Sequence, residues 1–541
     1  MSKKPQAIVI GLDGGTLNLM EDWMDEGKLP NFNIMRKNGA YGELNSTIPP
    51  YSAQAWTSIV TGCQPGKHGI YDFFVTSTIS KKLINSKYRK TPAIWNYLTD
   101  AGKKNIVVAV PGTYPPEKIN GVMITGLLTP SPKSEYTFPR ELKRDLIDGK
   151  IGEYILEQVA VDDIPKYLYA RHDPQKLVEK INRMTESHSN VTSNLMNKYD
   201  WDFSMYVIRG TDDAQHLLWN KKEYILSCYE KADEYVGKMM KSFPDALFII
   251  VSDHGFDTPG KYIYLNNFLF NNGYLKTKSD PRYSSENIML FFFDKISNLI
   301  FRLFPMEKLV RTSIGRKLII SKGPSANIDL SLTKAVYHSV CSRGIRIMLK
   351  DKYKDGIVDR KDYERLREEL IKLLKEIKDP ETGEFVIRNI YRWEEVYDKD
   401  AVNDPLDIII EPKQGYSTQE LIRQPYGLGS QSNSDGQPLS IIGAPGFYDW
   451  IGDHKPEGII FLYGNNVEKN KKIEASVIDI VPTVLGYLGV PIPDIIDGKL
   501  ISDAFVKKIK TTKITWKKEK TIEKPLLNSE MAKIRELKKK F

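Results

Sequence analysis

Residue types that bind metals or attack phosphorus stand directly after short apolar runs of this sequence. Asp13 follows the run 7–12, and its carboxylate either binds a metal ion or caps a turn. Ser52 stands where a loop becomes a helix, a place at which most serines only cap the helix. Backbone N–H groups at such a place favour an anionic phosphate, so Ser52 is also a candidate nucleophile.

Carboxylates and imidazoles occur together at later places in the chain. Asp212 and His216 are four residues apart, so on a helix both side chains face the same way. Asp253 and His254 are adjacent and reach one ion only from an irregular turn. His454 lies in a late loop. Each of these residues alone is more often a capping or loop residue than a metal ligand.

As a set, these residues are the donors that a two-metal phosphoryl-transfer centre requires. The carboxylates, imidazoles and hydroxyl divide into two sites of three or four ligands, and three of the seven histidines belong to them. A dinucleotide site is not indicated, because the first turn lacks the G-x-G-x-x-G pattern. The candidate metal ligands are Asp13, Ser52, Asp212, His216, Asp253, His254 and His454.

The elements that must position these residues follow an alternating pattern. Apolar runs typical of buried strands occur at 7–12, 105–110, 203–208 and 246–252, and helical patterns lie between them. This alternation predicts an α/β fold with a mostly parallel central sheet and helices on both faces. Ligands bind beyond the carboxyl ends of such strands, where the candidate residues stand.

Two stretches interrupt this pattern and divide the chain. We predict catalytic core parts at 1–129, 187–280 and 335–503. A polar, proline-containing lid or cap insertion is predicted at 130–186, and a helical insertion at 281–334. The aromatic run 289–304 within the second insertion is expected to form a helix that packs on the core or covers the active site, rather than one that lies on a membrane surface.

The net charge of the chain is concentrated at one end. The 541 residues include 78 Lys+Arg and 69 Asp+Glu, a formal excess of +9. Residues 504–541 contain 13 basic and 4 acidic side chains, so they carry the whole excess and the rest is formally neutral. This basic C-terminal tail is the candidate for weak contact with nucleic acid or an acidic membrane surface, although a solvated tail is the more frequent state.

The remaining composition is that of an ordinary globular protein. A hydrophobic content of 41% excludes disordered and collagen-like chains, and no apolar run is long enough to span a membrane. Three cysteines are too few for a disulfide framework, and the first residues do not resemble a secretion signal. We expect a cytoplasmic protein.

The ordered motifs resemble those of the alkaline phosphatase superfamily. Within it the sequence is similar to the type I phosphodiesterase/nucleotide pyrophosphatase branch, and more closely to archaeal and bacterial proteins described as predicted phosphohydrolases or phosphomutases. The resemblance runs from Ile8 to about Asp503. It rests on GLDGG at 11–15, Ser52 followed by AWTSIVTG at 55–62, PGKHGI at 65–70, TDDAQH at 211–216, SDHGF at 252–256 and GDHKPEG at 452–458.

The resemblance implies a role for each candidate residue. One ion would be held by Asp13, Asp253, His254 and Ser52, and the other by Asp212, His216 and His454. The two divalent ions would be Zn²⁺ or, less often, Mn²⁺. Ser52 would attack the phosphorus of a small-molecule phosphate ester and form a phospho-serine or nucleotidyl-serine intermediate.

Some residues depart from that branch. Its members mostly use threonine as nucleophile, and they carry an asparagine where this chain has Phe73, so nucleotide specificity is not implied. Arg209 and Lys67 are expected to be solvated rather than to bind phosphate. Two alternatives stay open: a cofactor-independent phosphomutase on the same metal centre, and a binding protein that uses the basic tail.

Overall fold

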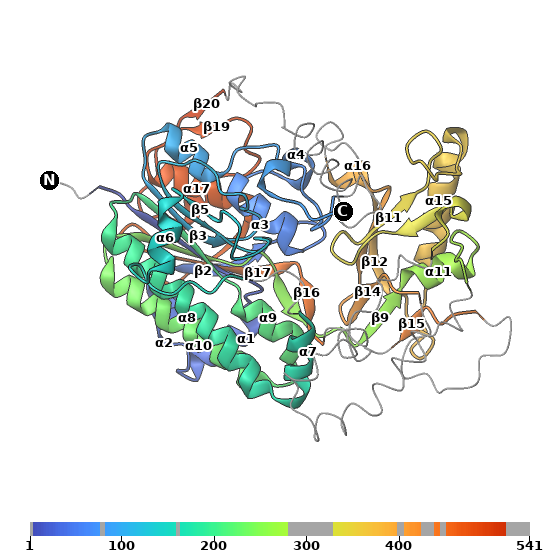
Figure 1. The fold of residues 1–541 in the computed structure, drawn as a ribbon, viewed down its shortest axis with the longest axis horizontal. Coiled ribbons are helices and arrows are strands. Elements are labelled where there is room, and N and C mark those ends of the chain that lie inside the picture. Colours follow the sequence, from blue (N-terminus) through green and yellow to red (C-terminus); the bar gives the residue numbers. More distant parts are fainter. Residues whose placement is uncertain are drawn as a thin grey trace, which may run out of the picture.

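Two units with separate hydrophobic cores make up the described part of the chain. The computed structural model describes residues 4–75, 82–157, 163–279, 328–397, 405–422, 438–443 and 451–515. The core unit comprises residues 4–257 and 451–515 of this part, and the second unit comprises residues 261–443. The two units lie side by side in Figure 1.

The core unit is built on a sheet of nine described strands. In spatial order these are β18 (Lys471–Ser476), β2 (Ala40–Asn45), β17 (Glu457–Tyr463), β7 (Leu247–Val251), β1 (Ala7–Leu12), β6 (Phe203–Ile208), β3 (Asn105–Val110), β4 (Gly121–Thr125) and β5 (Thr137–Phe138). Among them, β17 and β5 run against the common direction. The sheet is therefore mostly parallel, which confirms the predicted α/β fold class.

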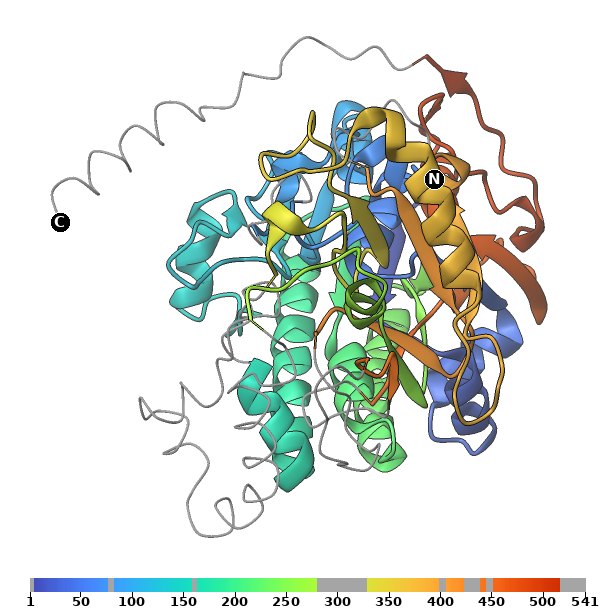
Figure 2. The same ribbon diagram turned by 90° about the vertical axis from the view of Figure 1, so that its right-hand side faces the viewer.

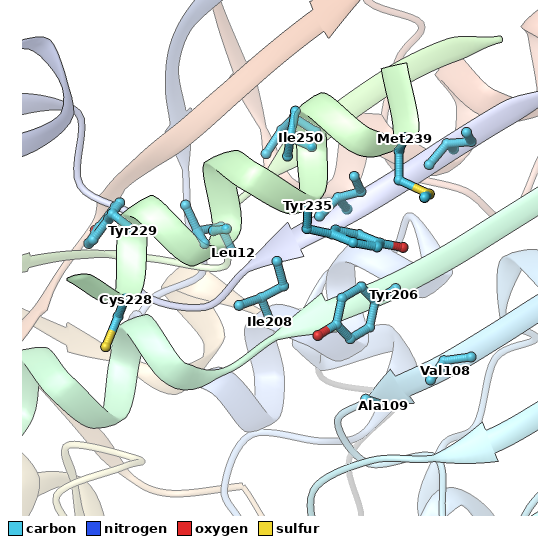
Figure 3. Packing of buried hydrophobic residues seen from close by; sticks show 14 of the residues in the cluster. Leu12, Val108, Ala109, Tyr206, Ile208, Cys228, Tyr229, Tyr235, Met239 and Ile250 are labelled. Atoms are coloured by element: carbon cyan, nitrogen blue, oxygen red, sulfur yellow. The ribbon is translucent and has the colours of Figure 1, made fainter. Parts of the chain in front are cut away.

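Helices cover both faces of this sheet. Successive side chains of a strand point to opposite faces, and in the central strands the side chains on both faces are apolar and need to be buried. Ile8, Ile10 and Leu12 of β1 pack on one face, whereas Ala7 and Val9 pack on the other. Figure 3 shows the first of these cores between the strands and α10. The helices on that face are α1 (Leu17–Asp25), α2 (Pro30–Asn38), α6 (Glu141–Ile147), α7 (Asp163–His172), α8 (Pro174–Lys198), α9 (Gly210–Leu218) and α10 (Lys222–Ser242). The opposite face carries α3 (Ser52–Thr61), α5 (Ile94–Asp100) and α17 (Ile480–Tyr487).

Gly11 in β1 allows α3 to approach the sheet closely. A Cβ atom at this position would lie 2.3 Å from the ring of Trp56, a distance that forces the indole to move. Gly11→Ala is therefore expected to lower the free energy of unfolding by about 1–3 kcal/mol, measured by urea denaturation. The control is Gly260→Ala, where the nearest atom to the new Cβ lies at 3.4 Å, and a change within about 0.5 kcal/mol is expected. Equal effects of the two substitutions would contradict this packing argument.

The second unit is a smaller antiparallel structure with its own core, facing the viewer in Figure 2. Its four-stranded sheet consists of β10 (Ala335–Tyr337), β11 (Gly344–Ile347), β13 (Ile408–Pro412) and β12 (Ile387–Arg392). Three further strands, β14 (Tyr416–Gln419), β9 (Lys261–Tyr264) and β15 (Ile442–Gly443), form a sheet beside it. The helices of the unit are α11 (Leu265–Asn271), α15 (Tyr363–Lys375) and α16 (Trp393–Val396).

The remaining short elements connect or extend these units. A two-stranded pair of β8 (Gly255–Asp257) and β16 (Asp453–Lys455) lies where the chain passes between the units. The others are α4 (Pro65–His68), β19 (Ile492–Pro493), β20 (Lys513–Ile514) and 3-10 turns at Ser86–Tyr88, Leu330–Leu332, Arg360–Asp362, Val477–Asp479 and Ser502–Ala504. Among the helices of the described ranges, none has the length and apolar character needed to cross a bilayer.

The predicted segments occupy defined places in this fold. Segment 130–186 contains β5, α6, α7 and the first half of α8, and its buried leucines belong to the core unit. Segment 335–503 contributes to both units, with 335–422 in the second unit and 451–503 in the core unit. Most of the predicted helical insertion, 280–327, lies outside the described residues, as does 516–541 of the predicted tail. Residues 504–515 include the buried Phe505 and the strand β20, which pairs with β19.

Asp72 is a buried carboxyl at the boundary of the two units. Phe74 donates its backbone N–H to Oδ1 of Asp72 at 3.0 Å, and Ser339 and Ser342 of the second unit act with this bond to lower the pKa of the carboxyl. Burial nevertheless raises the pKa of Asp72 from 3.8 to about 6. The folded protein therefore binds this proton more tightly than the unfolded chain does.

A pH-dependent loss of stability is expected from Asp72. The free energy of unfolding should fall as the pH rises from about 4 to about 6 and stay lower above that range, by up to about 3 kcal/mol. Asp72→Asn is expected to remove this decrease while it still accepts the N–H of Phe74. Urea denaturation of both proteins between pH 4.5 and 7.5 measures the difference. Parallel pH profiles for the two proteins would contradict the assignment.

Candidate metal centre

The order of strands in the sheet brings three carboxylates together. Asp13 directly follows β1, Asp212 lies in the first turn of α9 after β6, and Asp253 follows β7. Because β1 lies between β6 and β7 and is parallel to both, the carboxyl ends of the three strands meet at one edge. This is the edge at which parallel α/β sheets bind ligands.

Ser52 enters the same site from the start of α3. It is the first residue of the helix, after the extended residue Tyr51, and it is 5% exposed. Its Oγ lies 3.5 Å from Oδ1 of Asp13 and 3.2 Å from Nε2 of His254. The predicted position of Ser52 at a loop-to-helix junction is confirmed, and its hydroxyl faces the carboxylates.

The three candidate histidines present the same ring nitrogen to the site. Nδ1 of His216, His254 and His454 lies at 3.0–3.1 Å from the backbone carbonyls of Gly452, Gly255 and Pro50, respectively. A carbonyl at Nδ1 fixes the proton there and leaves Nε2 as the metal-binding atom. The predicted helical spacing of Asp212 and His216 is confirmed by α9, with Oδ1 and Nε2 at 3.3 Å.

The ligand atoms form two groups that share one histidine. Donor atoms of Asp13, Asp253 and His254 all lie within 4.8 Å of one another, and so do those of Asp212, His254 and His454. Nε2 of His216 lies 2.9 Å from Nε2 of His454, beside the second group. All seven predicted residues therefore lie in one buried cluster, and their division between two ions stays a prediction.

The chemistry of the donors fits divalent metal ions. Oδ1 of Asp212 and Oδ2 of Asp253 are buried and lack a well-formed hydrogen bond within the described part of the chain. A buried carboxylate oxygen without a partner is energetically costly, and a bound metal ion would supply the missing interaction.

The electrostatics of the site support the same conclusion. Burial, with Asp253 and Asp212 nearby, raises the pKa of Asp13, and burial with Asp212 raises the pKa of Asp253 to about 6. Burial lowers the pKa of His254 and of His454 to about 4, so both rings are neutral at pH 7 and able to bind a metal. Bound cations would compensate the mutual repulsion of the carboxylates.

Further residues of the core unit hold Asp13 and Asp253 in place. Nε1 of Trp56 donates to Oδ2 of Asp13 at 3.0 Å, and the hydroxyl of Thr211 donates to the backbone carbonyl of Asp13 at 2.6 Å. Gly14 donates its N–H to Oδ1 of Asp253 at 3.2 Å. Sequence reasoning did not identify Trp56 as a functional residue, although its place one helical turn after Ser52 puts both side chains on the same face.

Two basic residues behave differently from the sequence expectation. Arg209 is largely buried, and its Nη2 lies 3.2 Å from Asp213 and 3.7 Å from Asp212, so the expectation of a solvated side chain is wrong. The carboxylates of Asp212 and Asp213 attract this guanidinium. The burial of Arg209 beside them could not be read from the local sequence pattern. Lys67 is partly exposed and pairs with Asp497, away from the metal-ligand residues.

Comparison with known proteins identifies the family of this chain. A family model described as type I phosphodiesterase / nucleotide pyrophosphatase matches residues 7–431. No curated protein sequence gives a significant match to this chain.

Solved structures that align with most of this chain share little sequence with it. Murine ectonucleotide pyrophosphatase / phosphodiesterase 5 is 13% identical with a TM-score of 0.47, and the alignment covers 90% of this chain and 95% of that one. An inactive variant of the murine protein in complex with AMP gives the same identity and TM-score, with 96% of that chain covered. The human counterpart is also 13% identical, with a TM-score of 0.45 and coverage of 90% and 95%.

Proposed function

Because the chain belongs to the type I phosphodiesterase / nucleotide pyrophosphatase family, a branch of the alkaline phosphatase superfamily, we propose that it cleaves a phosphate ester through a covalent intermediate on Ser52. Family membership makes the chain a phosphoric ester hydrolase. The observation that carries the proposal is the position of the Ser52 hydroxyl, 3.5 Å from the Asp13 carboxylate and 3.2 Å from the His254 ring.

Two divalent metal ions are part of the proposed centre. Asp13, Asp253, His254 and Ser52 would hold one of them, and Asp212, His216 and His454 would hold the other. We propose Zn²⁺ first and Mn²⁺ second, because mixed imidazole and carboxylate donors suit both. When bound, such ions lower the pKa of a nearby hydroxyl and neutralise charge on phosphate oxygens.

The residues of the chain then perform a two-step displacement. Oγ of Ser52 attacks phosphorus and forms a new P–O bond while the bond to the leaving oxygen breaks, and the proton lost by Oγ passes through solvent to the leaving oxygen, which departs as an alcohol. The first turn of the ten-residue helix α3 favours the anionic phosphate beside Ser52. In the second step water attacks phosphorus, the bond to Oγ breaks, and one proton of the water passes to Oγ and regenerates the hydroxyl. Two in-line displacements leave the configuration at phosphorus unchanged.

A substrate panel with metal analysis tests this function. Purified protein loaded with Zn²⁺ or Mn²⁺ is assayed with bis-nitrophenyl phosphate and with mono-nitrophenyl phosphate. We expect hydrolysis of the diester to exceed hydrolysis of the monoester and to depend on about two bound ions per chain. Failure on both substrates together with isomerisation of a sugar phosphate would assign the chain to the phosphomutases instead. Hydrolysis unaffected by chelators would contradict the metal assignment.

We also propose a cytoplasmic location and a small-molecule substrate. The three cysteines are free and two of them, Cys63 and Cys228, are buried, which suits a reducing compartment. Fractionation of cells that express the full chain tests the location, and recovery in the extracellular fraction would contradict it.

A further inference from the structure

A loop of the second unit reaches into the core unit beside the metal-ligand residues. This loop joins β10 to β11 and spans residues 338–343. The side-chain amide of Gln54, in the first turn of α3, donates to the backbone carbonyl of Cys341 at 3.0 Å. The loop therefore contacts the same helix turn that carries Ser52.

Arg343 makes the central contact of this loop. Its Nη2 donates to Oδ2 of Asp453 at 3.1 Å and lies 3.5 Å from the backbone carbonyl of His454. Its guanidinium lies 5.2 Å from the centre of the Tyr51 ring, a cation–π distance. The residue is 4% exposed, so these contacts are made out of water, where a charged hydrogen bond is strongest.

The two residues that Arg343 contacts adjoin the catalytic serine and a metal ligand. Tyr51 immediately precedes Ser52, and Asp453 immediately precedes His454. Tyr51 also joins the two segments directly, because its hydroxyl lies 3.3 Å from Oδ1 of Asp453 and its ring lies 4.4 Å from the His454 ring. Ser417 of β14 donates a further hydrogen bond to Asp453, so Asp453 accepts hydrogen bonds from two side chains of the second unit, those of Arg343 and Ser417.

The backbone of Arg343 has an unusual conformation. Its φ angle is +43°, in the left-handed region that is costly for residues other than glycine. Such a conformation persists only where the surrounding contacts hold it. Here the backbone N–H of Arg343 donates to the carbonyl of Ser339 at 3.0 Å, and its own carbonyl accepts from the N–H of Ile410 at 2.9 Å, so the loop presents the side chain from a fixed backbone.

From these contacts we infer that Arg343 is a positioning residue of the proposed phosphoester hydrolase, through which the second unit fixes the relative placement of Ser52 and His454. The expected change in kcat rests on the proposed function, whereas the expected change in Zn²⁺ affinity does not require that the chain hydrolyses a phosphate ester. Arg343 touches the neighbours of both residues, so its loss lets the segments 50–52 and 453–454 shift relative to each other. Small displacements of this kind impair a metal centre more than they impair overall stability.

Three variants separate positioning from simple structural support. Arg343→Ala removes the contacts, and Arg343→Lys keeps the charge but not the forked geometry. Arg367→Ala is the matched control, because Arg367 is also 4% exposed but pairs with Glu394 entirely within the second unit. For each protein we measure kcat and KM on bis-nitrophenyl phosphate, Zn²⁺ affinity by equilibrium dialysis, and urea denaturation.

The expected pattern is specific to Arg343. Arg343→Ala should lower kcat by about 10- to 100-fold with KM within about threefold, and weaken the binding of one Zn²⁺ by a similar factor. Arg343→Lys should recover part of both losses. Arg367→Ala should lose stability but keep kcat and Zn²⁺ affinity within about threefold. If Arg343→Ala does not fold, Asp453→Asn, which keeps the size of the side chain, is expected to give the same losses.

Other outcomes would overturn the inference. Equal effects of Arg343→Ala and Arg367→Ala would reduce Arg343 to structural support, and a change in KM alone would make it a substrate-binding residue. If the wild-type protein hydrolyses no phosphate ester, the proposed function fails, but the Zn²⁺ affinities of the variants still decide whether Arg343 positions His454.

Discussion

Ser52→Ala is expected to abolish turnover while the protein keeps its fold and its bound metal ions. The side chain is small, and the six carboxylate and imidazole ligands remain in place, so the metal content should stay near that of the wild-type protein. In the proposed mechanism Oγ forms the bond to phosphorus, so its removal is expected to lower kcat on the order of 10⁴-fold or more. Initial rates with bis-nitrophenyl phosphate and metal analysis of the same preparation provide the measurement.

Ser58→Ala is the matched control for Ser52→Ala. Ser58 lies six residues later in α3, is also buried, and hydrogen-bonds to Nε2 of His68 at 3.0 Å instead of facing the metal-ligand residues. Its removal is expected to cost about 1 kcal/mol of stability and to leave kcat within about threefold. Unchanged activity of Ser52→Ala with both ions bound would remove Ser52 from the mechanism.

Asp212→Asn is expected to remove one of two bound metal ions and most of the activity. Oδ1 of Asp212 lies within 4 Å of Nε2 of His216, His254 and His454, so this single oxygen is surrounded by the imidazole donors. The amide has a similar size but no charge, and it is a weak ligand for Zn²⁺. We expect the Zn²⁺ content to fall from about two to about one ion per chain, and kcat to fall on the order of 10³-fold.

The neighbouring carboxylate provides a close control for this prediction. Asp213 lies on the same helix, but its carboxylate contacts Arg209 at 3.2 Å and Lys166 at 3.2 Å rather than the histidines. Asp213→Asn is expected to keep both ions and to retain kcat within about tenfold. If Asp213→Asn loses metal to the same extent as Asp212→Asn, general destabilisation rather than ligation explains the result.

The position of the site was predictable because the residues follow strands of one parallel sheet. The sequence has a carboxylate after each of three apolar runs. Because β1 pairs in parallel with both β6 and β7, these three carboxylates lie close together at one edge of the sheet. The spacing of Asp212 and His216 is equally local, since an α-helix brings residues four apart to one face. The approach of His454 was implied by the family resemblance and not by any local pattern.

The contribution of the second unit was not predictable from the sequence. Arg343 and Asp453 are 110 residues apart, and no periodicity connects them. Their pairing depends on how two units with separate cores meet, which is decided by long-range packing. The expectation that the Arg209 side chain is solvated was wrong for the same reason. Its burial depends on carboxylates, some of them distant in the sequence, that the fold brings close to it.

The place of β17 in the main sheet has a consequence for biosynthesis. This strand, residues 457–463, pairs with β2 on one side and with β7 on the other, although both partners leave the ribosome some 200 to 400 residues earlier. At about 5–20 residues per second, the nascent chain spends tens of seconds with an open gap between β2 and β7. His454 emerges just before the strand that closes this gap, so a chain released early has neither a complete sheet nor a complete set of the proposed metal ligands. Hydrolytic activity is thus expected only after the ribosome has passed residue 463.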